Sequence, residues 1–175
     1  MLVGAGEEKD AGGPVGIDTE TTGLNANGGD RLIELGCVEI VNRIPTGREF
    51  HRYLNPERDV HPDAVAVHGL TVDFLRDKPL FKEVADEFLD FIGDAPLVAH
   101  NSAFDQGFLN AELRRCGLPL LGDERFVDTL AIARKKFPGA SNSLDALAKR
   151  FQLDRYGFDL AARKGAGGHG ALVDR

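Results

Sequence analysis

Two carboxylates separated by one residue, Asp18 and Glu20, place the strongest constraint on how this chain can fold. They lie in residues 16–23, which read Gly-Ile-Asp-Thr-Glu-Thr-Thr-Gly, and Ile17 is typical of the end of a short apolar strand. Side chains alternate between the two faces of a strand, so both acids point the same way and repel each other. A hard divalent cation relieves that repulsion, because Mg²⁺ and Mn²⁺ take oxygen ligands. The alternative is a solvated strand edge, and this segment alone does not decide between the two.

The composition is that of an ordinary globular domain. The chain has 175 residues, of which 42% are hydrophobic and 28% charged, enough for one domain with its own core. Its net charge of −7 argues against a protein that coats nucleic acid by neutralising phosphates. That charge is compatible with an enzyme that meets a phosphate through bound metal ions. Cys37 and Cys116 lack metal-site spacing and are typical of thiols in a reducing compartment.

Residues 1–13 predict a disordered leader rather than a secretory signal. The segment is rich in glycine and charge, without a basic start or an apolar run. Nowhere is an apolar run long enough to cross a membrane. We therefore expect a cytoplasmic protein without membrane association and with one domain over residues 14–175.

The hydrophobic pattern predicts three strands, followed by alternating helices and strands. Apolar residues alternate over 31–41, with weaker strand signals at 14–17 and 49–54 and a turn at 44–47. The later elements are expected at 61–69 (helix), 71–75 (helical turn), 81–92 (helix), 97–99 (strand), 102–116 (helix), 126–127 (strand), 128–136 (helix) and 143–151 (helix). This order predicts an α/β fold, in which an antiparallel three-strand meander joins parallel strands in a mixed sheet flanked by helices.

Two further acids lie at predicted helix starts. Asp105 falls in the first turn of the helix at 102–116, where Ser102 is the expected N-cap and Asp105 the partner in a capping box. Asp105 is therefore either a capping acid favoured by the helix dipole or part of a functional site. Asp128 has the same ambiguity, and we favour a structural role for it.

Near the C-terminus, His169 and Asp174 lie five residues apart. On its own, His169 in a glycine-rich segment is more typical of a solvated side chain than of a catalytic one. Asp174 on its own carries no information. Both gain meaning only when they are joined to the earlier acids.

Three motifs occur in order along the chain: residues 18–23 (Asp-Thr-Glu-Thr-Thr-Gly), 100–105 (His-Asn-Ser-Ala-Phe-Asp) and 169–174 (His-Gly-Ala-Leu-Val-Asp). Together they resemble the exonuclease motifs of the DEDD superfamily, histidine subtype. Residues 67–70, 81–91 and 137–147 further resemble the family of proofreading epsilon subunits of bacterial DNA polymerase III. The resemblance covers about residues 17–174 and implies a ribonuclease H-like fold.

The resemblance implies a 3′-5′ exonuclease that proofreads during DNA replication with two divalent metal ions, Mg²⁺ or Mn²⁺. Asp18 would bridge the two ions, Glu20 and Asp174 would complete the tighter one, and Asp105 would support the second. His169 would be the general base that takes a proton from the attacking water. Two such ions, roughly 3.5–4 Å apart, hold the attacking and leaving oxygens of a phosphoryl transfer. The product would be a nucleoside 5′-monophosphate from a DNA 3′ end.

The resemblance also implies a pocket for the terminal nucleotide. Its expected residues are Asp18, Thr19, Glu20, Thr21, Thr22, Gly23, Leu24, Asp63, His68, Asn101, Phe104 and Asp174. Phe104 would border the pocket by stacking on a base, whereas His68 is also explained as a histidine favoured at a helix C-terminus. A frayed, mispaired end would reach such a pocket more readily than a paired one, because unpairing costs a few kcal/mol.

Two other functions stay open at this stage. One is an RNA-directed 3′ exonuclease of the same superfamily, which a comparison of ribonucleotide and deoxyribonucleotide substrates would distinguish. The other is a catalytically weak binding module on the same fold, which would bind Mn²⁺ poorly or not at all.

The C-terminus departs from the family and gives a first prediction. Arg175 directly follows Asp174, where the family continues into a helix on the sheet and then into a tail that binds the polymerase catalytic subunit. We expect an exonuclease domain truncated just after the third motif, with weakened association with the polymerase. Metal binding and activity should also be low, because Asp174 would lie on a fraying terminus. Full-strength Mn²⁺ binding in a titration, together with normal turnover, would contradict this expectation.

Overall fold

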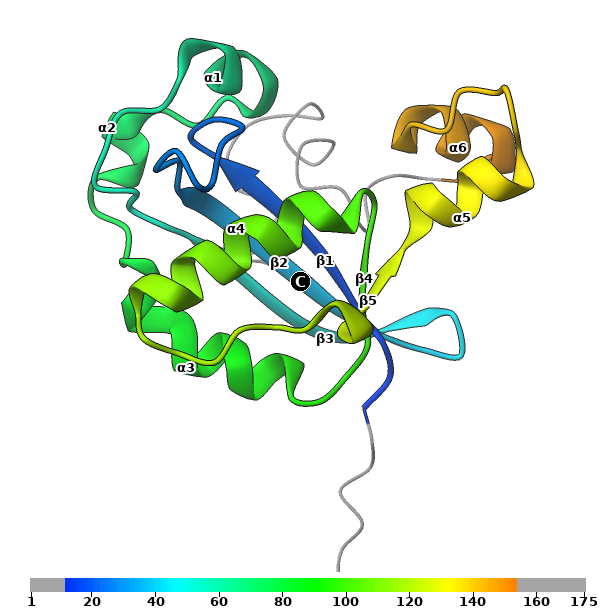
Figure 1. The fold of residues 1–175 in the computed structure, drawn as a ribbon, viewed down its shortest axis with the longest axis horizontal. Coiled ribbons are helices and arrows are strands. Elements are labelled where there is room, and N and C mark those ends of the chain that lie inside the picture. Colours follow the sequence, from blue (N-terminus) through cyan, green and yellow to red (C-terminus); the bar gives the residue numbers. More distant parts are fainter. Residues whose placement is uncertain (1–11, 154–175) are drawn as a thin grey trace, which may run out of the picture.

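The computed structural model describes residues 12–153, which form a five-stranded mixed sheet with helices around it (Figure 1). The strand order is β3-β2-β1-β4-β5; β2 is antiparallel to β1 and β3, whereas β4 is parallel to β1 and β5. The strands are β1 (Val15–Thr21), β2 (Leu32–Val41), β3 (Ile44–Tyr53), β4 (Leu97–Ala99) and β5 (Phe126–Asp128). The expected α/β fold with a meander and parallel strands is confirmed.

The helices occupy three places around this sheet. They are α1 (Pro62–His68), α2 (Val72–Leu75), α3 (Phe81–Ile92), α4 (Ser102–Arg115), the 3₁₀ turn η1 (Asp123–Arg125), α5 (Thr129–Lys136) and α6 (Leu144–Phe151). Figure 1 shows α3 and α4 over one face, α1 and α2 beyond the ends of β1 and β2, and α5 and α6 as an arm extending from β5. Among residues 12–153, no helix is long and apolar enough to cross a membrane.

Strand β1 is longer than the predicted segment at 14–17. It pairs with β2 along its whole length and with β4 at its start, through Val15 and Gly16. A central position supplies hydrogen bonds on both sides, which outweighs the weak strand propensity of its glycine. The strand therefore extends through Thr21, so Asp18 and Glu20 lie inside it rather than at its end.

The turn between β2 and β3 was expected at residues 44–47, but it lies earlier in the chain. It is made by Asn42 and Arg43, whose φ angles are 52° and 68°. Two-residue hairpin turns with positive φ at both positions match the twist of paired strands, and asparagine adopts this conformation readily. Pro45 then lies within β3, which is tolerated because β3 is an edge strand.

The hydrophobic core lies between the sheet and the α3–α4 layer. The predicted amphipathic pattern of α3 is confirmed, since Phe81, Val84, Ala85, Phe88 and Ile92 are all buried. From α4, Phe108, Leu109 and Leu113 complete this side of the core, and the sheet contributes Val15, Ile17, Leu35, Cys37 and Leu97. This packing fixes α4 against β1 and so positions the residues at the start of that helix.

A buried ion pair joins α4 to the start of β2. The guanidinium of Arg31 donates to both carboxylate oxygens of Glu112, at 2.7 and 3.0 Å, and the Leu32 N–H also donates to Glu112, at 3.3 Å. The side chain of Glu112 is only 1% exposed. A carboxylate this deeply buried needs its partners, because removing one leaves an uncompensated polar group.

Replacing Glu112 should therefore destabilise the fold. We expect Glu112→Ala to lower the free energy of unfolding by about 2–3 kcal/mol, because Arg31 and the Leu32 N–H lose their acceptor. Urea denaturation measures the change. Glu87→Ala is the matched control, since Glu87 forms an exposed ion pair with Arg52 and should change stability by less than about 1 kcal/mol. Equal effects of the two substitutions would contradict the prediction.

Candidate active site

Asp18 and Glu20 share one face of β1, as the alternation of the strand predicts. Both are partly exposed, whereas the intervening Thr19 and the flanking Thr21 are buried on the other face. On the neighbouring strand β2, Gly36 lies opposite Asp18 and Glu34 opposite Glu20. The glycine leaves space beside Asp18. The acid opposite Glu20 adds negative charge to the same region.

Asp105 approaches β1 from α4, which begins just after β4. Its side chain is 5% exposed, and its Oδ1 accepts a hydrogen bond from the Thr19 hydroxyl at 2.7 Å. The expected capping box is wrong, because Asn101 is the N-cap and Ser102 is the first helical residue. Asp105 is thus held by a strand that is distant in sequence.

Burial raises the pKa of Asp105 to about 7, while the Thr19 hydrogen bond works in the opposite direction and the negative charge of Asp18 adds to the rise. The two carboxylates therefore influence each other even though one comes from the sheet and the other from a helix. Such a pair is stabilised in its charged form by a cation with hard oxygen preference. The donor set of Asp18, Glu20 and Asp105 fits a divalent metal ion in its chemistry.

The described residues do not provide a complete metal site. Within residues 12–153, no three histidine, cysteine or acidic side chains come close enough together to hold an ion. The two other predicted site residues, His169 and Asp174, lie outside the described residues. Asp105 is thus held against β1 through Thr19, and the joint role of Asp18, Glu20 and Asp105 stays a prediction.

The corner that follows β1 is built by hydrogen bonds to Asp30. The Thr22 hydroxyl donates to Asp30 at 2.9 Å and accepts from the Arg31 N–H at 3.0 Å, and Thr22 is fully buried. Gly23 fits closely here, because a Cβ at this position would lie 2.5 Å from the Asp30 carboxylate. The predicted pocket residues Thr19, Thr21 and Thr22 therefore use their hydroxyls within the protein. Leu24, in contrast, is 87% exposed.

Helix α1 is attached to this corner at both of its ends. The His61 N–H donates to the Thr22 carbonyl at 2.8 Å. At the other end, the buried His68 accepts from the Leu70 N–H through Nδ1, so its proton lies on Nε2, which is 3.2 Å from the Thr21 carbonyl. His68 thus orients the backbone beside the acids, whereas the side chain of Asp63 on the same helix is 96% exposed.

At the start of α4, Asn101 and Phe104 occupy different environments. Asn101 adopts a left-handed conformation and donates its N–H to Asp128 at 3.0 Å. Asp128 also caps α5 by accepting from the Leu130 N–H at 2.9 Å, which confirms the structural role favoured for this acid. Phe104 is half-buried, with its ring 4.9 Å from that of Phe108. A role in base stacking stays a prediction for Phe104.

Sequence reasoning missed a polar cluster beside Glu20. Glu34 is 1% exposed and its carboxylate lies 2.8 Å from Nε2 of His51. Burial, together with the negative charge of Glu34, raises the pKa of Tyr53 to about 12. The available signal was an acid inside the apolar run of residues 32–35, since a buried carboxylate requires partners.

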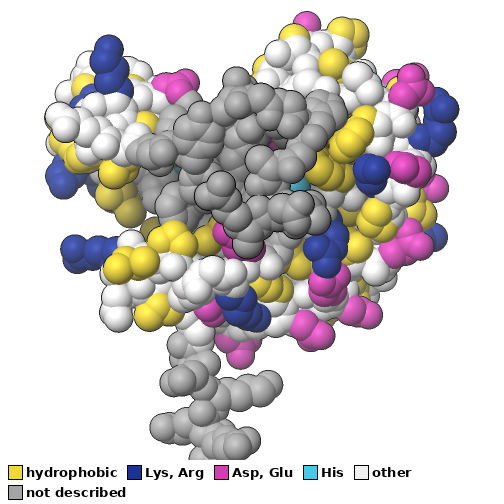
Figure 2. All heavy atoms as spheres, turned by 180° about the vertical axis from the view of Figure 1, so that it is seen from behind, with side chains coloured by type: hydrophobic (Ala, Val, Ile, Leu, Met, Phe, Trp, Pro, Cys, Tyr) yellow, Lys and Arg dark blue, Asp and Glu magenta, His cyan; other side chains and the backbone are white. Residues whose placement is uncertain are grey.

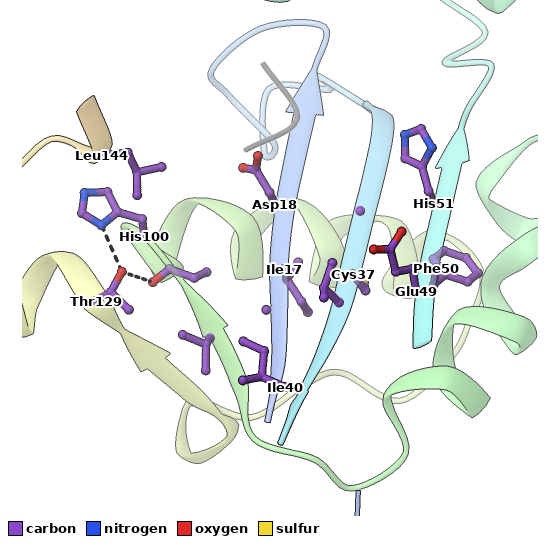
Figure 3. Close-up of a pocket in the computed structure, with 15 residues that line it drawn as sticks. Ile17, Asp18, Cys37, Ile40, Glu49, Phe50, His51, His100, Thr129 and Leu144 are labelled. Carbon is purple, nitrogen blue, oxygen red and sulfur yellow. Dashed lines mark hydrogen bonds between the residues drawn. The ribbon is translucent and has the colours of Figure 1, made fainter. Parts of the chain in front are cut away.

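A cavity of about 210 Å³ lies against the face of the sheet that carries Asp18 (Figure 3). Asp18 projects into it from β1, with His51 on one side and His100 on the other. Thr129 and Leu144, the first residues of α5 and α6, complete the wall near His100. His100 itself was not singled out as a site residue, although a histidine directly after a buried strand is the signal that could have found it.

The raised pKa of Asp105 predicts an unusual pH dependence of stability. Asp105 binds its proton more tightly when folded, so its contribution is complete below about pH 4 and is lost as pH rises through about 7. We expect Asp105→Asn to stabilise the metal-free chain at pH 8 by up to about 4 kcal/mol and to make no difference at pH 4. Urea denaturation with a chelator measures both proteins at each pH. A difference that is independent of pH would contradict the prediction.

Comparison with known proteins identifies the family. A family model described as Exonuclease matches residues 15–174. The chain is 49% identical to the DNA polymerase III subunit epsilon of Rickettsia felis over 161 residues, which cover 90% of this chain and 67% of that protein. It is 48% identical to the Escherichia coli subunit over 165 residues, which cover 90% and 65% of the two chains.

A solved structure of exonuclease X in complex with 5′ overhanging duplex DNA has the same fold. The TM-score is 0.65 at 27% identity, over 85% of this chain and 83% of that one. The chain spans about two thirds of the length of the curated relatives named above. The exonuclease class of enzyme expected from the sequence motifs is confirmed. The chain belongs to the exonuclease family and, within it, to the DNA polymerase III epsilon subunits.

Proposed function

We propose that this chain is the proofreading 3′-5′ exonuclease of a replicative DNA polymerase, releasing nucleoside 5′-monophosphates from DNA 3′ ends. The observation that carries the proposal is the hydrogen bond from Thr19, which lies between Asp18 and Glu20 on β1, to the buried Asp105 on α4. The names of its curated relatives support the replicative role. The DNA bound to the structurally similar exonuclease X supports a DNA substrate.

The metal requirement follows from the donor set. Members of this superfamily depend on divalent metal ions, and we propose two, Mg²⁺ or Mn²⁺, held by Asp18, Glu20, Asp105 and Asp174. When bound, such ions stabilise the attacking and leaving oxygens of the phosphodiester. In this proposal the chain would contribute these four carboxylates, whose negative charge favours a divalent cation. Thr19 contributes by keeping the Asp105 carboxylate in one orientation.

Proton transfer is assigned to His169. An imidazole titrates near neutral pH and can accept the proton of the attacking water. The assignment rests on the position of His169 five residues before Asp174, as in the third motif.

The terminal nucleotide is proposed to lie against the corner that follows β1. Leu24 offers an exposed apolar side chain there, and Asp63 extends into solvent from the helix that His61 and His68 attach to the same corner. We propose that this corner takes a single-stranded end. A frayed mismatch supplies such an end at lower cost than a paired terminus.

The proposed role also implies a partner protein and a cellular location. We propose association with the catalytic subunit of DNA polymerase III, because the curated relatives are subunits of that enzyme. Replication would place the chain in the bacterial cytoplasm.

Hydrolysis of a labelled DNA primer tests the proposal. With Mn²⁺ or Mg²⁺ present, we expect the chain to release 5′-mononucleotides from the 3′ end, faster from a mismatched than from a paired terminus. Asp18→Ala should lower the rate at least about a hundredfold, because it removes a carboxylate from the metal cluster. Asp94→Ala is the matched control and should retain full activity, since Asp94 is an exposed acid beyond the end of α3.

Three results would contradict the proposal. Release from the 5′ end would exclude the direction, and equal activity of Asp18→Ala would exclude the site. A strong preference for an RNA primer of the same sequence would instead favour the RNA-directed alternative.

A further inference from the structure

The arm formed by α5 and α6, residues 129–151, has a charge opposite to that of the chain as a whole. It carries one acid, Asp145, and five basic residues, all exposed: Arg134, Lys135, Lys136, Lys149 and Arg150. The complete chain has a net charge of −7. Figure 2 shows basic side chains around the arm, at the upper left, whereas acidic and basic side chains are mixed on the opposite side. The arm is therefore a locally basic element of an acidic chain.

The arm begins at the candidate active site. The Thr129 hydroxyl, at the start of α5, lies 3.0 Å from Nδ1 of His100 and donates to the Ala99 carbonyl at 3.2 Å. With Leu144 at the start of α6, both Thr129 and His100 line the cavity that contains Asp18 (Figure 3).

A second cavity of about 730 Å³ continues along the arm. It lies between α5 and α6 and is lined by Arg134. It shares His100 and Leu144 with the cavity at Asp18. The two cavities are therefore adjacent, and Arg134, one of the five basic residues of the arm, lines the second.

Hydrogen bonds hold the arm in a defined shape. Nε2 of His100 lies 2.9 Å from the Asn142 carbonyl, and the buried Asn142 side chain donates to the carbonyls of Phe137 and Ala140 at 3.2 and 3.0 Å. Arg150 lies 4.5 Å from the centre of the Phe137 ring. The loop between the two helices is thus tied to β4, which gives the basic surface a fixed orientation relative to the site.

We propose that the α5–α6 arm binds the phosphate backbone of the DNA strand whose 3′ end lies in the active site. The proposal rests on the proposed exonuclease function and adds the surface that holds the rest of the strand. Phosphates are the complementary partner for exposed Lys and Arg side chains. Phe151, 47% exposed on α6, offers a face on which a base can stack.

An acidic chain has a particular need for such a surface. The active-site carboxylates and the net charge of −7 repel a polyanion. A local basic surface beside the site offsets that repulsion where the strand must pass.

The test compares two triple variants with equal changes in net charge. The arm variant is Arg134→Gln, Lys135→Gln and Lys149→Gln. The control is Arg43→Gln, Lys82→Gln and Arg114→Gln, which removes exposed charges from other parts of the surface. Affinity for a fluorescent 20-nucleotide single strand is measured by anisotropy between 50 and 200 mM KCl with a chelator, so that no hydrolysis occurs.

We expect the arm variant to bind about tenfold more weakly at 100 mM KCl, and the slope of log K against log salt to become shallower by about 2. The control should stay within about twofold of the original chain. In the presence of Mn²⁺, the arm variant should show a raised KM on the 20-nucleotide strand with kcat retained. Hydrolysis of the p-nitrophenyl ester of thymidine 5′-monophosphate, too short to reach the arm, reports on the site alone.

Equal weakening by both variants would overturn the proposal in favour of a general charge effect. Unchanged DNA binding by the arm variant would also overturn it, and loss of polymerase binding in that case would make the arm a protein-docking surface. The unsubstituted chain could bind DNA through the arm and yet hydrolyse neither substrate. That result would contradict the proposed function while supporting the binding surface. Circular dichroism of both variants confirms that each is folded.

Discussion

The hydrogen bond between the Thr19 hydroxyl and the Asp105 carboxylate is the interaction on which the site depends. It spans 86 positions of sequence and joins the strand with the first two acids to the helix with the third. A carboxylate buried to this degree is costly to ionise, which is why its pKa lies near 7. In the proposed metal site, a divalent cation would offset the cost of ionising this carboxyl.

The sheet order explains how the helix reaches β1. Strand β4 pairs with β1 only at Val15 and Gly16 and then ends at Ala99. Beyond that point α4 turns back over the sheet, so that its first turn meets β1 where the acids lie. The same end of β4 carries His100, which ties the α5–α6 arm to the sheet. Because β4 is short, the later part of β1 has no strand paired with it on that side. The segments that follow β4 place the Asp105 carboxylate and the start of the α5–α6 arm there.

Local signals predicted most of the elements, and their failures have physical causes. The helical period of α3 was clear because its apolar residues lie on one face and its polar residues on the other. Strand β2 was predictable from its apolar residues. The turn at Asn42 and Arg43 was missed because Pro45 and the following Gly47 are stronger turn formers, yet an edge strand tolerates them. Ser102 and Asp105 had capping-box spacing, but the Asp105 carboxylate instead accepts a hydrogen bond from Thr19 on β1. Glu34 and His51 went unnoticed because cross-strand pairing is not visible along the chain.

The sequence by itself determined the chemistry: three motifs in order, their acids and histidines, and the α/β succession of elements. These features are local, since alternation, caps and motif spacing are set by neighbouring residues. Only the tertiary structure decided which acids meet, that the threonines of the first motif turn their hydroxyls inward, and that His68 holds the backbone beside them. It also decided that the arm with the basic runs 134–136 and 149–150 begins at the cavity that Asp18 lines. Burial and proximity depend on contacts between distant segments, and no local pattern specifies those.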